Sequence, residues 1–213
     1  MLAPQALIFD MDGLMIDSEP LWWDVERALA KEHGHPWSDE LAHQCVGTGL
    51  PNTIATMKRE LGLDIGIDEG VTWLVDTFIS RLADLELKPG LIELVDASDE
   101  AGLGMAVASS SSLRLIHAVL DRFDMRERFA VVISGESVPN HKPAPDIFLA
   151  TAEQLGVPPH ACVVLEDSVA GVKSAAAAEI PVIAIPEFNK EAFPALTPHV
   201  LADLHQAREL LGL

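Results

Sequence analysis

The feature that most constrains the fold is a series of five short apolar runs that recur along the chain. The runs begin at Ala6, Met105, Ala130, Cys162 and Val182, and polar turn residues follow each of them. The starts of the last four runs lie 25, 32 and 20 residues apart, which is the length of an ordinary β-α-β unit. Unbroken apolar runs, without alternation of apolar and polar residues, are typical of strands that are buried on both faces. The pattern therefore predicts an α/β fold, with a Rossmann-like parallel sheet and helices on both of its faces.

The spacer between the first and second runs is far longer than the others. It spans 99 residues from Ala6 to Met105, and its apolar side chains recur every three or four positions, as in amphipathic helices. Within it we expect helices over residues 52–61 and 69–87. Because the spacer is almost purely helical in pattern, we interpret it as an inserted all-helical cap domain. The predicted domains are a core of residues 1–15 and 89–213 and a cap of residues 16–88.

Charge and composition exclude several classes of partner. The chain carries a formal net charge of −19, with a pI near 4.6, which disfavours binding to nucleic acid and to anionic membrane surfaces. It has no apolar stretch of about 18 residues and no basic N-terminal segment followed by an apolar core. Cys45 and Cys162 are the two cysteines, and we expect no disulfide between them. We therefore expect a cytoplasmic protein in which any anion site is locally positive.

Two aspartates follow the first apolar run directly. Residues 6–13 read A-L-I-F-D-M-D-G, so Asp10 and Asp12 lie at the carboxyl end of the predicted strand, where open α/β sheets bind ligands. Residues two apart in an extended segment point the same way, so both carboxylates can face one small volume. Such a pair repels itself unless a cation neutralises it, and it therefore indicates a metal site. The alternative is that the aspartates only form the turn after the strand.

Polar side chains also follow the second, third and fourth runs. Ser109 and Ser110 begin a run of four serines before a predicted helix, where hydroxyl groups and free amides form an anion cradle. Lys142 lies beside two prolines in the loop after the third run, and Glu166 and Asp167 end the fourth. Each feature alone has a structural alternative, because serines and acids also cap helices and a loop lysine is usually solvated. Together they offer the carboxylate oxygens that Mg²⁺ prefers, beside groups that bind phosphate.

These residues, in this order, resemble the four motifs of the haloacid dehalogenase (HAD) superfamily, in its capped phosphatase and β-phosphoglucomutase-like branch. The D-x-D-G sequence at residues 10–13 is similar to the first motif, Ser109 to the second, Lys142 to the third, and Glu166 with Asp167 to the fourth. The match spans nearly the whole chain.

The resemblance implies phosphoryl transfer through an aspartyl-phosphate. Asp10 would attack the phosphorus atom, and Asp12 would protonate the leaving oxygen and later deprotonate the attacking water. Lys142 and Ser109, with Ser110 beside it, would hold the remaining phosphate oxygens. Mg²⁺ is the implied cofactor. Its implied ligands are Asp10, the backbone carbonyl of Asp12, Glu166 and Asp167.

Substrate choice is expected to lie in the cap. Gly47 matches the substrate-binding glycine of the branch's cap loop, but Thr48, Gly49 and Leu50 stand where β-phosphoglucomutases carry an arginine that grips a second phosphate. Residues 16–22 are similar to those of bacterial hexose-phosphate and 2-deoxyglucose-6-phosphate phosphatases. The resemblance thus implies a monomeric phosphatase whose partner is a small phosphorylated metabolite, a sugar phosphate. The alternatives are a β-phosphoglucomutase-like mutase and, more distantly, a receiver-like or noncatalytic phosphate-binding protein.

Overall fold

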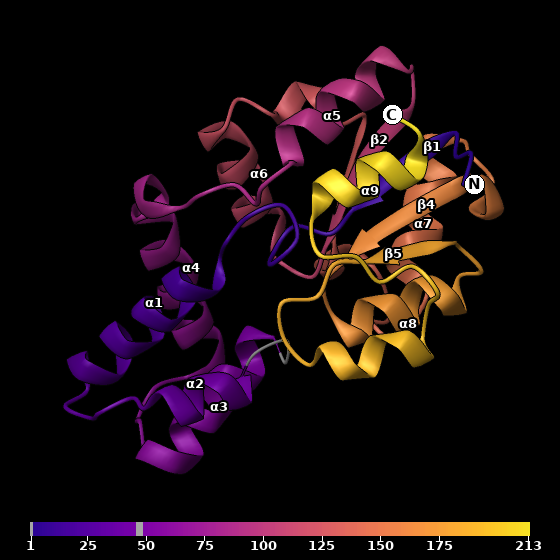
Figure 1. The fold of residues 1–213 in the computed structure, drawn as a ribbon. Coiled ribbons are helices and arrows are strands. Elements are labelled where there is room, and N and C mark those ends of the chain that lie inside the picture. The colour runs from indigo at the N-terminus through magenta and orange to yellow at the C-terminus, as the bar shows by residue number, and fades with distance from the viewer. Residues whose placement is uncertain (1, 46–48) are drawn as a thin grey trace. The chain divides into compact units, whose positions relative to one another are not determined.

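A computed structural model describes residues 2–45 and 49–213 of the chain (Figure 1). The chain divides into two compact units, which we call the core unit (Met1–Asp17 and Glu86–Leu213) and the cap unit (Ser18–Leu85). The first boundary therefore lies two residues later than the one placed from sequence, and the second lies three residues earlier. Within the described residues, no helix has both the length and the apolar character needed to cross a membrane.

The core unit is built on a parallel five-stranded sheet with the strand order β3-β2-β1-β4-β5. The central strand β1 (Ala6–Phe9) pairs with β2 (Gly104–Ser109) on one side and with β4 (Cys162–Glu166) on the other. The edge strands are β3 (Val131–Ser134) and β5 (Val182–Ala184). All five predicted strands form, and the predicted Rossmann-like fold class is confirmed.

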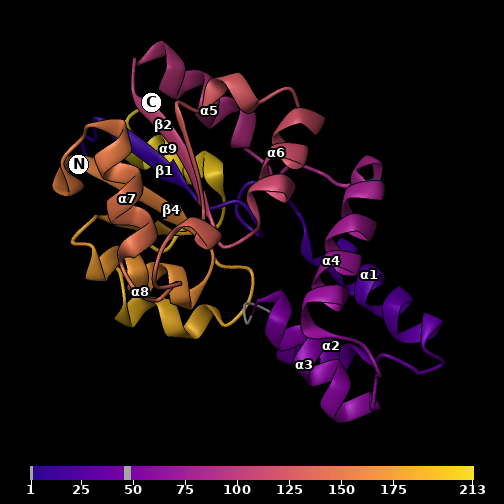
Figure 2. The ribbon, with the colours of Figure 1, turned by 180° about the vertical axis from the view of Figure 1, so that it is seen from behind.

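Five helices of eight residues or more cover the two faces of this sheet. Ala6, Ile8 and the matching side chains of the other strands share one apolar cluster with α7 (Asp146–Leu155) and α8 (Val169–Ala177), which cover that face (Figure 2). On the opposite face α5 (Leu91–Glu100) packs against α9 (Leu204–Leu211), as Figure 1 shows. The helix α6 (Leu113–Arg122) contacts β3. Short 3₁₀ helices occupy Arg126–Arg128, Gly135–Ser137, Pro159–Ala161 and Lys190–Ala195.

The strand register brings three chain segments to one point at the carboxyl edge. Phe9, the last residue of β1, lies opposite Val107 of β2 and Leu165 of β4. The next residue, Asp10, donates its backbone N–H to the Leu165 carbonyl at 3.0 Å. Since all the strands run the same way, the residues that follow each of them emerge together at this edge.

The cap unit consists of helices α1 (Glu19–Glu32), α2 (Asp39–Cys45), α3 (Leu50–Leu61) and α4 (Ile67–Ser80), followed by a 3₁₀ turn at Leu82–Asp84. Its buried core includes Trp22 and Phe78, whose ring centroids lie 4.1 Å apart. The predicted helix over residues 69–87 was wrong at its end, because α4 stops at Ser80. The residues that follow return to the core unit in an extended conformation, in which Leu87 pairs antiparallel with Ile16 and Lys88 N–H donates to the Met15 carbonyl at 2.9 Å.

Candidate active site

A buried lysine joins the ends of three strands. Lys142, in the loop between β3 and α7, directs its Nζ to Asp10 Oδ1 at 2.5 Å, Glu166 Oε1 at 2.7 Å and the Ala108 carbonyl at 3.2 Å. Its side chain is 5% exposed, and those of Asp10 and Glu166 are 9% and 1% exposed. The ring of Phe148 lies below the ammonium group, at 4.8 Å from its centroid. The three charged groups therefore form an ion cluster that is almost sealed from solvent.

Burial and mutual charge shift the pKa values of this cluster. Burial raises the pKa of Asp10 to about 7, helped by the negative charges of Glu166 and Asp12 and opposed by Lys142. Burial by itself lowers the pKa of Lys142, but the carboxylates of Asp10 and Glu166 outweigh it and raise that pKa above its ordinary value. The lysine therefore stays a cation at neutral pH, whereas Asp10 lacks full compensation for its charge.

Asp167 belongs to the same electrostatic cluster. Burial raises its pKa well above the ordinary value, and the charges of Glu166 and Asp10 raise it further. Its carboxylate fills the space that a side chain at Gly13 would take, since a Cβ there would lie 2.2 Å from Asp167 Oδ2. Gly13 also has a φ of +79°, a conformation that favours glycine. The first loop therefore closes over Asp167 only because residue 13 is a glycine.

The donor chemistry of the cluster fits a divalent cation. The buried carboxyl groups of Asp10 and Glu166 and the half-buried one of Asp167 face the single charge of Lys142, and each additional negative charge raises the pKa of its neighbours. Carboxylate oxygens are the ligands that Mg²⁺ prefers, and a bound cation would relieve this repulsion. As placed, no group of three or more His, Cys, Asp or Glu side chains within residues 2–45 and 49–213 has a metal-binding arrangement. Two of the carboxylates contact Lys142 instead.

Both carboxylate oxygens of Glu166 accept hydrogen bonds. Its Oε2 accepts the backbone N–H of Ser168 at 2.8 Å and the Ser168 hydroxyl at 2.9 Å, while Oε1 accepts Lys142. Ser168 also caps α8 through a bond from Gly171 N–H at 3.0 Å. A Cβ at Gly171 would lie 1.6 Å from Glu166 Oε1, so this carboxylate requires a glycine behind it. The fixed glutamate in turn orients the lysine.

The second aspartate contacts the serine run. Ser111 Oγ donates to Asp12 Oδ2 at 2.7 Å, and Ser109 Oγ lies 3.5 Å from the same oxygen. Ser109 is buried at 1% exposure, and the side chain of Ser110 is exposed. Ser112 caps α6 by accepting the backbone N–H of Leu115 at 3.4 Å. Sequence reasoning named Ser109 and Ser110 as site residues and left out Ser111, although the serine run itself marked the loop.

Of the predicted site residues, the structure gathers Asp10, Lys142, Glu166 and Asp167 in one electrostatic cluster and joins Asp12 to Ser109 by its serine contacts. Gly47 lies outside the described residues. Gly13, Gly171 and Ser168 support the cluster and were not predicted as site residues. Gly13 had a sequence signal, as the last residue of the D-x-D-G motif, whereas the need for a glycine at residue 171 is recognised only once the Glu166 side chain is placed.

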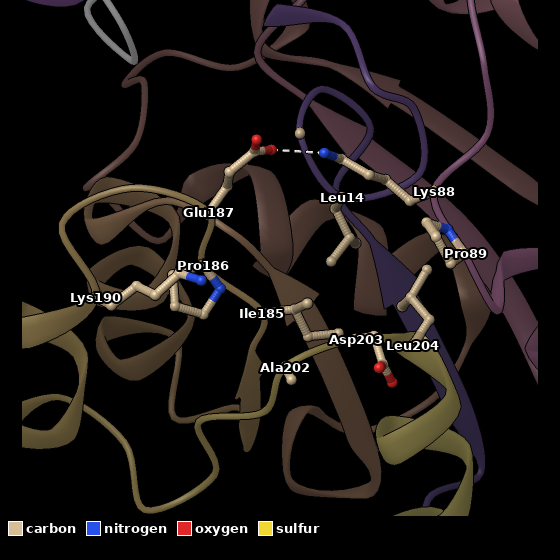
Figure 3. Close-up of a pocket in the computed structure, with 11 residues that line it drawn as sticks. Leu14, Lys88, Pro89, Ile185, Pro186, Glu187, Lys190, Ala202, Asp203 and Leu204 are labelled. Carbon is tan, nitrogen blue, oxygen red and sulfur yellow. Dashed lines mark hydrogen bonds and ion pairs between the residues drawn. The ribbon is translucent and has the colours of Figure 1, made fainter.

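A separate pocket of about 210 Å³ adjoins the first loop of the core unit (Figure 3). Leu14, Ile185 and Leu204 contribute apolar side chains to its lining. Lys88 at its rim donates to Glu187 at 2.6 Å and to Asp17 at 2.8 Å. Lys88 follows the cap unit in the chain, and it therefore links this segment to Asp17, which precedes the cap unit, and to Glu187 in the loop after β5.

Fold and site together define a class of protein. A parallel sheet that brings a buried carboxylate pair, a lysine and serine hydroxyls to its carboxyl edge holds the groups that phosphoryl-transfer enzymes use for nucleophilic attack and for stabilising phosphate charge.

Comparison with known proteins identifies the family. Residues 7–185 match the family model described as haloacid dehalogenase-like hydrolase. The chain is 35% identical to hexitol phosphatase B of Escherichia coli, over 97% of this chain and 96% of the relative. It is 33% identical to the phosphorylated carbohydrates phosphatase of Thermotoga maritima, over 83% of this chain and 82% of the relative. The crystal structure of CbbY from Rhodobacter sphaeroides in complex with phosphate is 28% identical, with a TM-score of 0.86 and coverage of 94% and 95%.

The chain belongs to the haloacid dehalogenase-like hydrolases. The predicted family resemblance is confirmed, and the chain is an enzyme, a phosphatase of this family.

Proposed function

We propose that the protein is a Mg²⁺-dependent phosphatase that hydrolyses a small sugar phosphate through an aspartyl-phosphate at Asp10. The observation that carries this proposal is the contact of 2.5 Å between Lys142 Nζ and Asp10 Oδ1, inside a nearly sealed site at the end of the central strand. Two relatives support the substrate class, since their names are hexitol phosphatase and phosphorylated carbohydrates phosphatase.

Asp10 is assigned as the nucleophile. It follows the central strand, and its backbone is anchored by the bond from its N–H to the Leu165 carbonyl at 3.0 Å, so its carboxylate points out of a rigid element. Attack on phosphorus forms an Asp10–phosphate bond as the ester oxygen leaves, and water later breaks that bond. Splitting one displacement into two easier steps is the general gain of covalent catalysis.

Lys142 is assigned to the phosphoryl oxygens. Its ammonium group is positioned by Asp10, Glu166 and the Ala108 carbonyl, and its raised pKa keeps it charged. A preorganised cation in a nearly sealed site stabilises the charge that spreads over the equatorial oxygens during transfer. Ser109 is assigned to the same oxygens because its hydroxyl is buried at the end of β2. Ser110 and Gly47 are assigned to substrate binding.

Asp12 is assigned as the general acid and base. It lies two residues beyond the nucleophile and is bonded to the hydroxyl of Ser111, whereas Lys142 binds Asp10 and Glu166. The two aspartates therefore have different environments, which is how paired carboxylates acquire different roles. Asp12 gives its proton to the leaving ester oxygen in the first step and takes a proton from the attacking water in the second.

Asp10, Asp167 and the backbone carbonyl of Asp12 are the groups that would hold Mg²⁺. When bound there, the ion reduces the repulsion between phosphate and the Asp10 carboxylate. Glu166, whose oxygens are engaged by Lys142 and Ser168, is assigned to orienting Lys142 and to adding negative charge around the ion.

A substrate screen tests the proposal. The purified enzyme is assayed against phosphorylated hexoses, hexitols and short acids, with Mg²⁺ or with EDTA, while inorganic phosphate and sugar-phosphate isomers are measured together. We expect Mg²⁺-dependent phosphate release from at least one sugar or hexitol phosphate, and none from Asp10→Asn. Isomer formation without phosphate release would favour the mutase instead. If each protein molecule is phosphorylated once and inorganic phosphate is not released repeatedly, the result would favour a receiver-like protein.

A further inference from the structure

The serine run after β2 gives each of its members a different environment. Ser109 is buried, Ser110 is exposed, and Ser112 caps α6. Of the two serines that contact Asp12, Ser111 approaches it more closely, with its Oγ at 2.7 Å from Oδ2, compared with 3.5 Å for Ser109. Neither helix capping nor packing in the core accounts for the position of the Ser111 hydroxyl, so its bond to Asp12 needs a functional explanation.

Ser111 is itself held in place from a third strand. Ser134, the last residue of β3, is 3% exposed, and its Oγ donates to the Ser111 carbonyl at 2.7 Å. The same Oγ accepts the backbone N–H of Glu136 at 3.1 Å. The Ser111 N–H donates to Ser109 Oγ at 3.1 Å. The backbone of Ser111 is therefore fixed on both sides, and its hydroxyl offers Asp12 a partner at a defined position.

We propose that Ser111 is a positioning residue, which holds the Asp12 carboxylate in the orientation needed for proton exchange with the leaving oxygen. This inference rests on the proposed role of Asp12 as general acid. Asp12 lies on the first loop and is half-buried, and a hydrogen bond from a fixed partner is one restraint on the rotation of its side chain. Ser111 provides that restraint from a different strand end, and small errors in the placement of a catalytic group reduce rates strongly.

The test compares two esters that differ in their need for a general acid. Phenyl phosphate and 2,4-dinitrophenyl phosphate present the same phosphoryl group, but dinitrophenolate leaves without protonation. We expect Ser111→Ala to lower kcat/KM for phenyl phosphate by about 10- to 100-fold, as for the loss of one hydrogen bond to a charged group. For the dinitrophenyl ester we expect a loss of less than about threefold. Ser111→Thr, which keeps the hydroxyl, should restore most of the activity towards phenyl phosphate.

Two controls separate positioning from other roles. Ser112→Ala is the same chemical change one residue away, and it removes a helix cap without touching Asp12. It should lower the melting temperature while leaving the ratio of activities on the two esters unchanged. Inhibition by inorganic phosphate should be unaffected by Ser111→Ala, whereas a phosphate-binding role for Ser111 would weaken it. Equal losses on both esters, or weaker phosphate inhibition, would overturn the inference.

A double-mutant cycle distinguishes failure of this inference from failure of the proposed function. Asp12→Ala should impair phenyl phosphate selectively, and adding Ser111→Ala to it should have no further effect. If Asp12→Ala shows no preference between the esters, the role proposed for Asp12 is wrong and the inference falls with it. If Asp12→Ala is selective but Ser111→Ala is not, the proposed function stands and the positioning role of Ser111 is refuted.

Discussion

A buried carboxyl group in the cap unit allows a quantitative test of how this protein responds to pH. Glu26 lies in α1 at 4% exposure, and its Oε2 accepts the indole N–H of Trp37 at 3.0 Å. Burial raises its pKa from 4.5 to about 7, and the bond from Trp37 opposes this rise. The folded cap therefore binds a proton on Glu26 in a pH range where the unfolded chain has lost it.

The sign of the effect follows from that difference in proton binding. Between pH 4.5 and about 7 the folded state holds more protons on Glu26 than the unfolded state, so the free energy of unfolding falls as pH rises. Each pKa unit corresponds to about 1.4 kcal/mol, so Glu26 destabilises the cap by about 3 kcal/mol above pH 7, relative to pH 4. Below pH 4.5 and above about pH 7, the contribution of Glu26 to the free energy of unfolding no longer changes with pH.

Glu26→Gln removes the charge while keeping the size of the side chain and an acceptor for Trp37. At pH 8 we expect the free energy of unfolding to rise by about 3 kcal/mol, because the variant avoids the cost of the buried charge and the raised pKa of Glu26 already includes the bond from Trp37. At pH 4 the variant and the natural protein should agree within about 1 kcal/mol, since Glu26 is then neutral in the fold.

Urea unfolding followed by tryptophan fluorescence measures this effect. All four tryptophans lie within residues 18–85, so the signal reports the cap unit. Glu32→Gln, at an exposed position in α1, is the matched control and should change stability by less than about 0.5 kcal/mol at either pH. A difference between Glu26→Gln and the natural protein that is the same at pH 4 and pH 8 would refute the reasoning.

The remaining predictions concern the core unit. Asp10→Asn should lower turnover of the best sugar phosphate by more than about two decades without loss of the circular dichroism signal, and residual turnover near the natural rate would exclude Asp10 as the nucleophile. Lys142→Met should destabilise the core by about 3–5 kcal/mol in urea at pH 8, because two buried carboxylates lose their cation. Gly171→Ala should lower kcat by at least about tenfold, because its Cβ displaces Glu166 from Lys142; an unchanged kcat would mean that this orientation is unimportant. Incubation with EDTA should abolish activity and added Mg²⁺ should restore it, whereas activity that survives chelation would exclude the metal.

Local patterns predicted much of the architecture. An unbroken apolar run such as Ala6–Phe9 is visible in the order of the residues alone. Because parallel strands all run in the same direction, the residues that follow them then lie at one edge of the sheet. Where the chain changed direction the pattern was less informative. The apolar residues after Ser80 continue a helical spacing in the sequence, but α4 ends there. Leu87 instead pairs with Ile16, because the segment that leaves the cap unit runs beside the segment that enters it.

The amino-acid sequence by itself determined the strands, the family and the residues that lie at the carboxyl edge, because these depend on short apolar runs and on motifs a few residues long. Tertiary structure alone decided which of those residues meet. Lys142 reaches Asp10 across 132 positions of sequence, and Ser111 rather than Ser110 contacts Asp12. Contacts of this kind depend on loop conformation and on the burial of one element against another, and no local sequence pattern encodes either of them.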